Sequence, residues 1–89
     1  MAIVSESDEQ RLQAALAAEL RAIQGIANIT VRTWVADIPV SADSLYRVLR
    51  GGRPVTVVEL LLLCDAVDED PQDVIARAVT RARSSASPR

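Results

Sequence analysis

The chain has 89 residues, 49% of them apolar, and a formal net charge of −2, because 12 Asp and Glu residues outnumber 10 basic residues, all of them Arg. This length fits one compact domain and argues against a multi-domain enzyme. The chain contains no His and a single Cys, Cys64, which excludes a disulfide framework and a zinc site with ordinary ligand spacing. We therefore expect no metal and no cofactor.

The sequence predicts no targeting segment. Residues 1–4 lack the basic residues that open a signal peptide, and an acidic segment follows them. The longest apolar run, residues 60–64, is too short to cross a bilayer. We expect a cytoplasmic protein that makes no membrane contact.

Two helices are predicted in the first half of the chain. Ser7 and Gln10 have the spacing of a capping box, and apolar residues recur at helical spacing after them, which predicts a helix over residues 8–25 behind a flexible N-terminus of residues 1–6. These apolar residues are Leu12, Ala15, Leu16, Leu20 and Ile23. Thr30 caps a second helix over residues 31–37, which Pro39 ends because proline has no N–H group.

Three helices are predicted in the second half. Ser41 caps one that ends at residues 51–52, and Thr56 and Glu59 form a capping box for the next, which reaches about Val67. Asp70 caps the last helix, with Pro71 at its first position, and this helix runs to about residue 83. The sequence therefore predicts an all-α domain over residues 7–83, followed by a disordered tail of residues 84–89.

Residues 30–51 have the organisation of a helix-turn-helix. A two-turn helix, a tight connection and a second short helix follow one another, and the positions where the two helices cross are apolar. These positions are Val35, Val40, Leu45 and Val48. In such a unit the second helix presents its N-terminal residues to the major groove of DNA.

This stretch resembles the DNA-binding domains of phage Cro and lambda-repressor-like proteins, the XRE family, and the likeness covers roughly residues 10–80. The residues that carry it are Ile29 and Thr30 at the entry, Val40 and Ser41 after the turn, Leu45, Val48 and Gly51 in the second helix, Arg53 and Pro54 in the loop, and residues 60–67 and 70–75 beyond. The resemblance implies a five-helix lambda-repressor-like domain that binds operator DNA, with a homodimer as a candidate state.

The chain departs from the family pattern at several positions. Pro39 stands where the turn usually has Gly, and Val35 where the first motif helix usually has Ala. Val31 stands where many relatives have a Gln that contacts a phosphate. A buried Arg–Glu pair that is common in the family is replaced here by Gln24 and Leu49.

The resemblance implies two sets of contacts with DNA. The base-contacting set is Ala42, Asp43, Ser44, Tyr46 and Arg47. The backbone-contacting set is Thr30, Arg32, Ser41, Arg50, Gly51, Gly52 and Arg53. In this set the N–H groups of the two glycines approach a phosphate, and Arg50 and Arg53 clamp it. Arg47 is the strongest base reader, because a guanidinium can donate twice to guanine.

Charge placement supports this interface although the total charge is negative. Residues 41–56 hold three Arg against one Asp, a balance of +2, whereas residues 65–73 hold five acids and no base. The alternative is that these arginines are solvated helix ends, and Asp43 could simply stabilise the first turn of its helix.

Other residues have structural interpretations. Trp34 belongs in the core, where its indole N–H needs an acceptor, and Cys64 is a small buried hydrophobe. If Val57, Leu60, Leu61, Cys64 and Val67 face the core, then Val58 and Leu62 point outward. That pair forms a dimer contact or lies beneath the last helix.

We therefore expect a sequence-specific transcriptional regulator of the phage repressor or Cro type that blocks polymerase at an operator. An antitoxin-type autoregulator of the same fold, or a helical protein-interaction module without DNA binding, are the alternatives. We expect no enzyme, because no nucleophile, base and orienting group converge in the sequence.

Overall fold

A computed structural model of the protein describes residues 6–86, and the environments of their side chains from residue 8 to residue 84. These residues form five α-helices and no strand, which confirms the all-α prediction. The helices are α1 (Glu6–Ala27), α2 (Val31–Trp34), α3 (Ala42–Leu49), α4 (Val57–Ala66) and α5 (Pro71–Ala86). Within the described residues, no helix is both long enough and apolar enough to cross a membrane.

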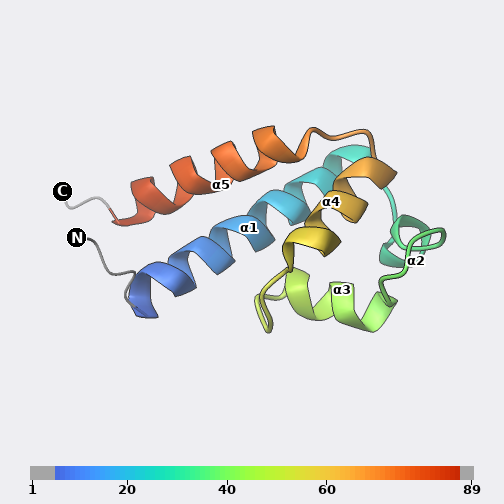
Figure 1. Cartoon of the computed structure of the whole chain (residues 1–89), viewed down its shortest axis with the longest axis horizontal. Helices are drawn as coiled ribbons and strands as arrows, with labels where there is room; N and C mark the ends of the chain where they lie inside the picture. The colour runs from blue at the N-terminus through green and yellow to red at the C-terminus, as the bar shows by residue number, and fades with distance from the viewer. Residues whose placement is uncertain (1–5, 87–89) are drawn as a thin grey trace.

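The two long helices, α1 and α5, lie side by side and run in opposite directions (Figure 1). α3 contacts α1, α2 contacts α3, and α4 contacts α5, so the three shorter helices gather around one end of the long pair. The extents of 41 × 21 × 21 Å describe an elongated molecule. The pair α1–α5 therefore forms an arm, and α2, α3 and α4 form a head beside it.

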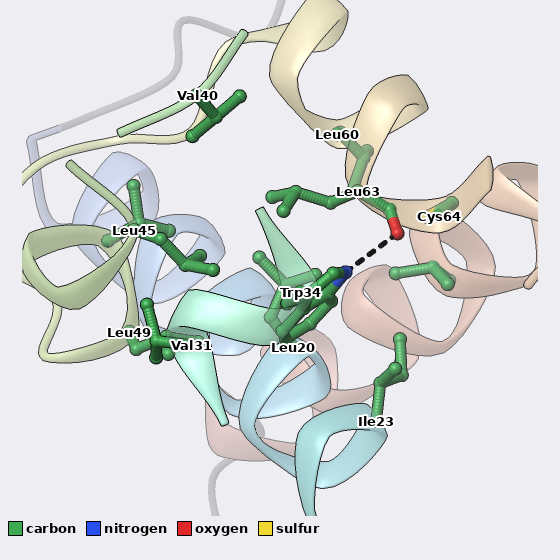
Figure 2. Close-up of a cluster of buried hydrophobic side chains, with 12 residues drawn as sticks. Leu20, Ile23, Val31, Trp34, Val40, Leu45, Leu49, Leu60, Leu63 and Cys64 are labelled. Atoms are coloured by element: carbon green, nitrogen blue, oxygen red, sulfur yellow. Dashed lines mark hydrogen bonds between the residues drawn. The ribbon is translucent and has the colours of Figure 1, made fainter. Parts of the chain in front are cut away.

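The main core lies where all five helices meet. Leu20, Leu45, Leu63 and Val74, from four different helices, are at most 1% exposed. Trp34 of α2 lies among them, and its indole N–H donates to the carbonyl oxygen of Leu63 at 2.9 Å (Figure 2). The predicted place of Trp34 in the core, and its need for an acceptor, are both confirmed.

Cys64 is fully buried in the same core, as predicted. Burial, with a smaller contribution from the charge of Glu69, raises the pKa of its thiol. The thiol is therefore protonated near neutral pH and packs as a small apolar group.

The arm has a separate small core made of alanines. Ala15 of α1 and Ala78 and Ala82 of α5 are nearly inaccessible, and Leu16 packs against them. Alanine has no side chain beyond Cβ, so this interface buries little apolar area and depends on other contacts for part of its stability.

The ends of α1 differ from the prediction. Ser7 lies inside the helix and is not its N-cap, since α1 already includes Glu6. Gly25 also lies inside, and the helix ends before Asn28, which has a φ of 56°. Asn28 donates its N–H to the carbonyl of Gln24 at 2.9 Å, a helix-ending bond that a residue with positive φ makes possible.

α2 is shorter than predicted and α5 is longer. α2 ends at Trp34, and the next residues form i→i+3 turns, with Ile38 donating to the carbonyl of Val35 at 3.3 Å, because the residue before Pro39 is disfavoured in helical geometry. α5 continues to Ala86, so residues 84–86 are helical and do not belong to a disordered tail. The rest of that predicted tail, residues 87–89, and residues 1–5 of the predicted flexible N-terminus lie outside the described residues.

The predicted starts of the last two helices are confirmed. Thr56 and Glu59 form the capping box of α4, in which the Thr56 hydroxyl accepts from the Glu59 N–H at 3.1 Å and the Glu59 carboxylate accepts from the Thr56 N–H at 2.9 Å. Pro71 opens α5, and the Asp70 carboxylate accepts from the Gln72 N–H at 2.8 Å. Both helices thus begin where polar side chains satisfy unpaired N–H groups.

Candidate nucleic-acid interface

α3 has one buried face and one exposed face. Leu45, Val48 and Leu49 are buried against the core, which fixes the rotation of the helix. The opposite face exposes Asp43, Tyr46 and Arg47, all from the predicted base-contacting set. Tyr46 is 47% exposed, so the ring is accessible on this surface.

The other two members of the base-contacting set are less available. Ala42 and Ser44 are half-buried, and Ala42 packs against the core cluster. The methyl group of Ala42 is therefore engaged within the protein, which weakens the case for its predicted contact with a base.

The hydroxyls at the helix starts act as caps. Ser41 accepts from the N–H of Ser44 at 3.0 Å, and Thr30 accepts from the N–H of Thr33 at 3.1 Å. Thr30 also donates its hydroxyl proton to the hydroxyl of Thr33 at 3.0 Å. The hydroxyl oxygens of Ser41 and Thr30 therefore serve the starts of their helices. Thr33, which the sequence did not single out, is exposed and bonded to Thr30.

Gly51 and Gly52 use their N–H groups to end α3. Gly51 has a φ of 77° and donates to the carbonyl of Val48 at 2.9 Å, and Gly52 donates to the carbonyl of Arg47 at 2.8 Å. This is a helix C-cap of the kind that glycine permits. The expectation that these N–H groups face a phosphate is therefore wrong, and the two glycines serve the helix instead.

Arg53 is half-buried, and its guanidinium is engaged by other groups of the chain. Its guanidinium binds both carboxylate oxygens of Glu59, at 2.6 and 3.2 Å, and also donates to the carbonyl of Pro54 at 2.9 Å. Hydrogen bonds from Arg53, then from the Thr56 backbone, lower the pKa of Glu59 despite its partial burial. The predicted phosphate clamp of two arginines is thus reduced to Arg50, and the local balance of +2 falls to +1 once Arg53 is paired with Glu59.

The arginines without protein partners gather on α2 and α3. Of the described arginines, four have side chains that make no hydrogen bond or ion pair within the described residues: Arg32, Arg47, Arg50 and Arg83. The first three lie in α2, in α3 and at the C-cap of α3, and all are exposed. Arg11, Arg21, Arg53, Arg77 and Arg81 donate to acids or carbonyls of the chain itself. The exposed surface of α2 and α3 therefore carries guanidiniums whose charge is not neutralised by the fold.

The opposite pattern holds along the arm, where the sequence suggested only apolar contacts. The Glu19 carboxylate, 7% exposed, accepts from Arg77 at 2.9 Å and from Arg81 at 2.7 Å, and Arg77 also reaches Glu69 at 3.4 Å. Burial raises the pKa of Glu19, but the hydrogen bonds and charges of Arg77 and Arg81 outweigh it, so the pKa is lowered overall. A signal was present in the sequence, since Glu19 stands midway between Ala15 and Ile23 in the apolar stripe.

The outward face of α4 differs from the prediction. Val58 is 65% exposed as expected, but Val57 and Leu61, assigned to the core, are 69% and 47% exposed. Leu62, expected to point outward, is half-buried and packs against the core cluster. We refer to Val57, Val58 and Leu61 as the α4 patch. These three residues, and not the predicted pair of Val58 and Leu62, form the exposed apolar surface of α4.

Comparisons with models of protein families, with curated proteins and with solved structures find no match to this chain. What the chain does must therefore be argued from the geometry of its own residues.

Proposed function

We propose that the protein binds double-stranded DNA through α2 and α3 and regulates transcription by occupying an operator. In this proposal the two helices form a helix-turn-helix, with α3 in the major groove and α2 across the phosphate backbone. The mode of action, a repressor or Cro-type block of polymerase, follows from the resemblance of residues 10–80 to lambda-repressor-like proteins.

The observation that carries the proposal is the distribution of unpaired guanidiniums. A chain with a net charge of −2 gains little from non-specific attraction to DNA, so binding has to come from charges placed at the interface. Three of the four described arginines without a protein partner lie on α2 and α3. Arg47 occupies the exposed face of α3 for base contact, while Arg32 and Arg50 flank it for phosphate contact.

The experiment compares two variants with the same kind of substitution. Arg32→Gln, Arg47→Gln and Arg50→Gln are combined in one protein. The control is Arg83→Gln, at the one other described arginine whose side chain has no partner. Duplexes are first selected by the wild-type protein from a random library, and binding is then measured by fluorescence anisotropy. We expect the triple variant to lose at least about a hundredfold in affinity and the control to lose less than about threefold.

Two results would contradict the proposal. One is a wild-type protein that enriches no sequence and binds no duplex at low salt. The other is an equal loss of affinity in the triple variant and the Arg83 control, which would place binding elsewhere on the surface.

A second candidate function rests on the α4 patch. Three exposed aliphatic side chains on one helix suit a protein partner, as in an antitoxin-type autoregulator or an interaction module without DNA binding. The duplex selection separates these, because an interaction module would enrich no sequence and an autoregulating antitoxin would.

A further inference from the structure

A cavity of about 300 Å³ lies in the head, where α2 and the loop after it face the C-terminal end of α4 (Figure 1). α2 ends at Trp34, and the loop of residues 35–39 that follows it leaves this space beside α4 open. The volume is at the lower end of the range of pockets that bind small molecules, roughly 300 to 1,000 Å³. The cavity is therefore large enough for a small organic ligand.

The walls of the cavity are mainly apolar. Ile29, Ile38 and Val67 are half-buried and line it, and Trp34, which is 3% exposed, lines it next to the core. An apolar group that enters the cavity releases water from these side chains, which favours binding. The walls thus favour a ligand with a carbon body over a fully hydrated ion.

Two carboxylates share the cavity with these apolar side chains. Asp37 comes from the loop after α2 and Asp65 from α4, and both are exposed. Neither side chain makes a hydrogen bond or an ion pair within the described residues. The described lining includes no basic side chain, and residues 65–73 hold five acids and no base. The charge that complements this cavity is therefore positive.

The groups that line the cavity favour an organic cation over a metal ion. Ca²⁺ and Mg²⁺ are bound by about six or more oxygen ligands, whereas this cavity offers two carboxylates among apolar side chains. In the part of the chain that the structure describes, no three His, Cys, Asp or Glu residues are grouped to hold a metal ion. An ammonium group can donate to the carboxylates while the carbon body attached to it contacts the apolar walls.

Hydrogen bonds within the protein hold the walls in place. The indole N–H of Trp34 donates to the carbonyl of Leu63 at 2.9 Å (Figure 2), and the side chain of Gln24 donates to the carbonyl of Ile29 at 3.1 Å. Backbone turns fix the loop of residues 35–38. Because these groups are already ordered, a ligand loses little affinity to ordering them.

We propose that this cavity binds a small organic ammonium ion, with its carbon body against Trp34 and the aliphatic walls and its charge toward Asp37 and Asp65. The site goes beyond the proposed DNA binding, because none of its lining residues belongs to the predicted base-contacting or backbone-contacting sets. Either proposal can therefore fail without the other.

The test is a titration of the full-length, ¹⁵N-labelled protein followed by NMR. The probe is 2-phenylethylamine, which is a cation at neutral pH. Two comparison compounds each lack one of its features: 2-phenylethanol keeps the ring but has no charge, and ethylamine keeps the charge but has no ring. The indole N–H signal of Trp34, the only tryptophan, and the amide signals of the lining residues report where each compound binds.

We expect 2-phenylethylamine to shift these signals in a saturable way, and both comparison compounds to bind at least about fivefold more weakly. The double variant Asp37→Asn/Asp65→Asn should lose at least about fivefold in affinity for 2-phenylethylamine. The control is Asp68→Asn/Asp73→Asn, which removes the same charge from two exposed residues of the same acidic stretch that do not line the cavity. The control should bind within about twofold of the wild type.

Four results would overturn the inference. If none of the compounds shifts the signals of the lining residues, the cavity is not a binding site. Equal binding of 2-phenylethanol and 2-phenylethylamine would show that the carboxylates recognise no charge. Equal losses in the two double variants would assign the attraction to the overall field of residues 65–73. Saturable shifts of the same signals by CaCl₂, without shifts by 2-phenylethylamine, would make the cavity a metal site.

Discussion

At the scale of single residues, the arginines divide by what they contact. Those along the arm and in the loop before α4 bind acids or carbonyls of the chain itself, so their charge supports the fold. Arg32, Arg47 and Arg50 have no such partner in the part of the chain that the structure describes, so their charge is available to a ligand. Arg47 and Arg50 nevertheless occupy different places, one on the exposed face of α3 and one at its C-cap.

Arg47→Ala and Arg50→Ala should therefore change DNA binding in different ways. Loss of Arg47 should relax the preference at one or two base pairs, by about 1 to 3 kcal/mol, because a bidentate contact to a base is lost. Loss of Arg50 should weaken binding to all sequences alike and reduce the salt slope by about one unit, because a phosphate contact is lost. Affinities for the selected duplex and for its single-base variants test this, and identical profiles for the two variants would refute the assignment.

Trp34→Phe should destabilise the core by about 1 to 3 kcal/mol, because the buried carbonyl of Leu63 loses its indole donor. Urea denaturation followed by circular dichroism measures the free energy of unfolding. Tyr46→Phe is the matched control: Tyr46 is 47% exposed, so this change should alter stability by less than about 0.5 kcal/mol. Equal losses in both variants would show that the Trp34 hydrogen bond contributes nothing specific.

At the scale of elements, the contact between α1 and α5 depends on charge as well as packing. Its apolar part is built on Ala15, Ala78 and Ala82, and beside them Glu19 joins Arg77 and Arg81. The two arginines are each 48% exposed, so solvent weakens the attraction, but the carboxylate itself is buried. Removing the charge of Glu19 should weaken the contact between α1 and α5 more than a substitution on the surface would.

Glu19→Gln should lower the free energy of unfolding at pH 7 by about 1 to 3 kcal/mol, because three charge-assisted hydrogen bonds from Arg77 and Arg81 become weaker or are lost. The folded-state pKa of Glu19 lies below its ordinary value of 4.5, so its stabilisation is present above that value and is lost as the pH falls through the lowered pKa. The difference between wild type and variant should thus shrink in acid. Glu9→Gln, an exposed position on α1, is the control and should change stability little.

The sequence predicted where the helices lie better than it predicted which side of each helix is buried. Capping residues such as Thr56 and Asp70 act locally, so they identified the starts of α4 and α5. The buried face of α4 depends on which helices pack against it, and a run of apolar residues such as 60–63 has no polar side to indicate its rotation. Leu63 was therefore missed as a core residue, and Leu61 was assigned to the core although it is half-exposed.

The candidate site shows the same limit. The resemblance pointed to five residues of α3, of which Asp43, Tyr46 and Arg47 are exposed and the other two are half-buried. The pairing of Arg53 with Glu59 arises from a loop, whose path the sequence pattern does not determine. The N–H groups of Gly51 and Gly52 were misassigned because a glycine pair after a helix suits a C-cap as well as a phosphate site.

At the scale of the whole molecule, acidic residues and unpaired arginines lie in different regions. Acids predominate over residues 65–73, at the end of α4 and the start of α5, while the unpaired arginines of α2 and α3 lie elsewhere. Two of these arginines, Arg32 and Arg50, are assigned to phosphates, and each neutralised phosphate contributes about −0.9, so the slope of log affinity against log salt should be about −1.8 for each bound copy. Titrations between about 50 and 200 mM salt measure this slope. A slope near zero would mean that phosphates are not contacted.

The only tryptophan and the only cysteine of the chain lie in the same core, in different helices. Trp34 fluorescence reports the state of this core optically, and the Cys64 thiol reports it chemically, since a labelling reagent can reach the sulfur only after the helices separate. The wild-type protein thus contains two independent reporters of one event. Agreement between its fluorescence transition and its rate of thiol labelling would show that α2 and α4 leave this core in a single step.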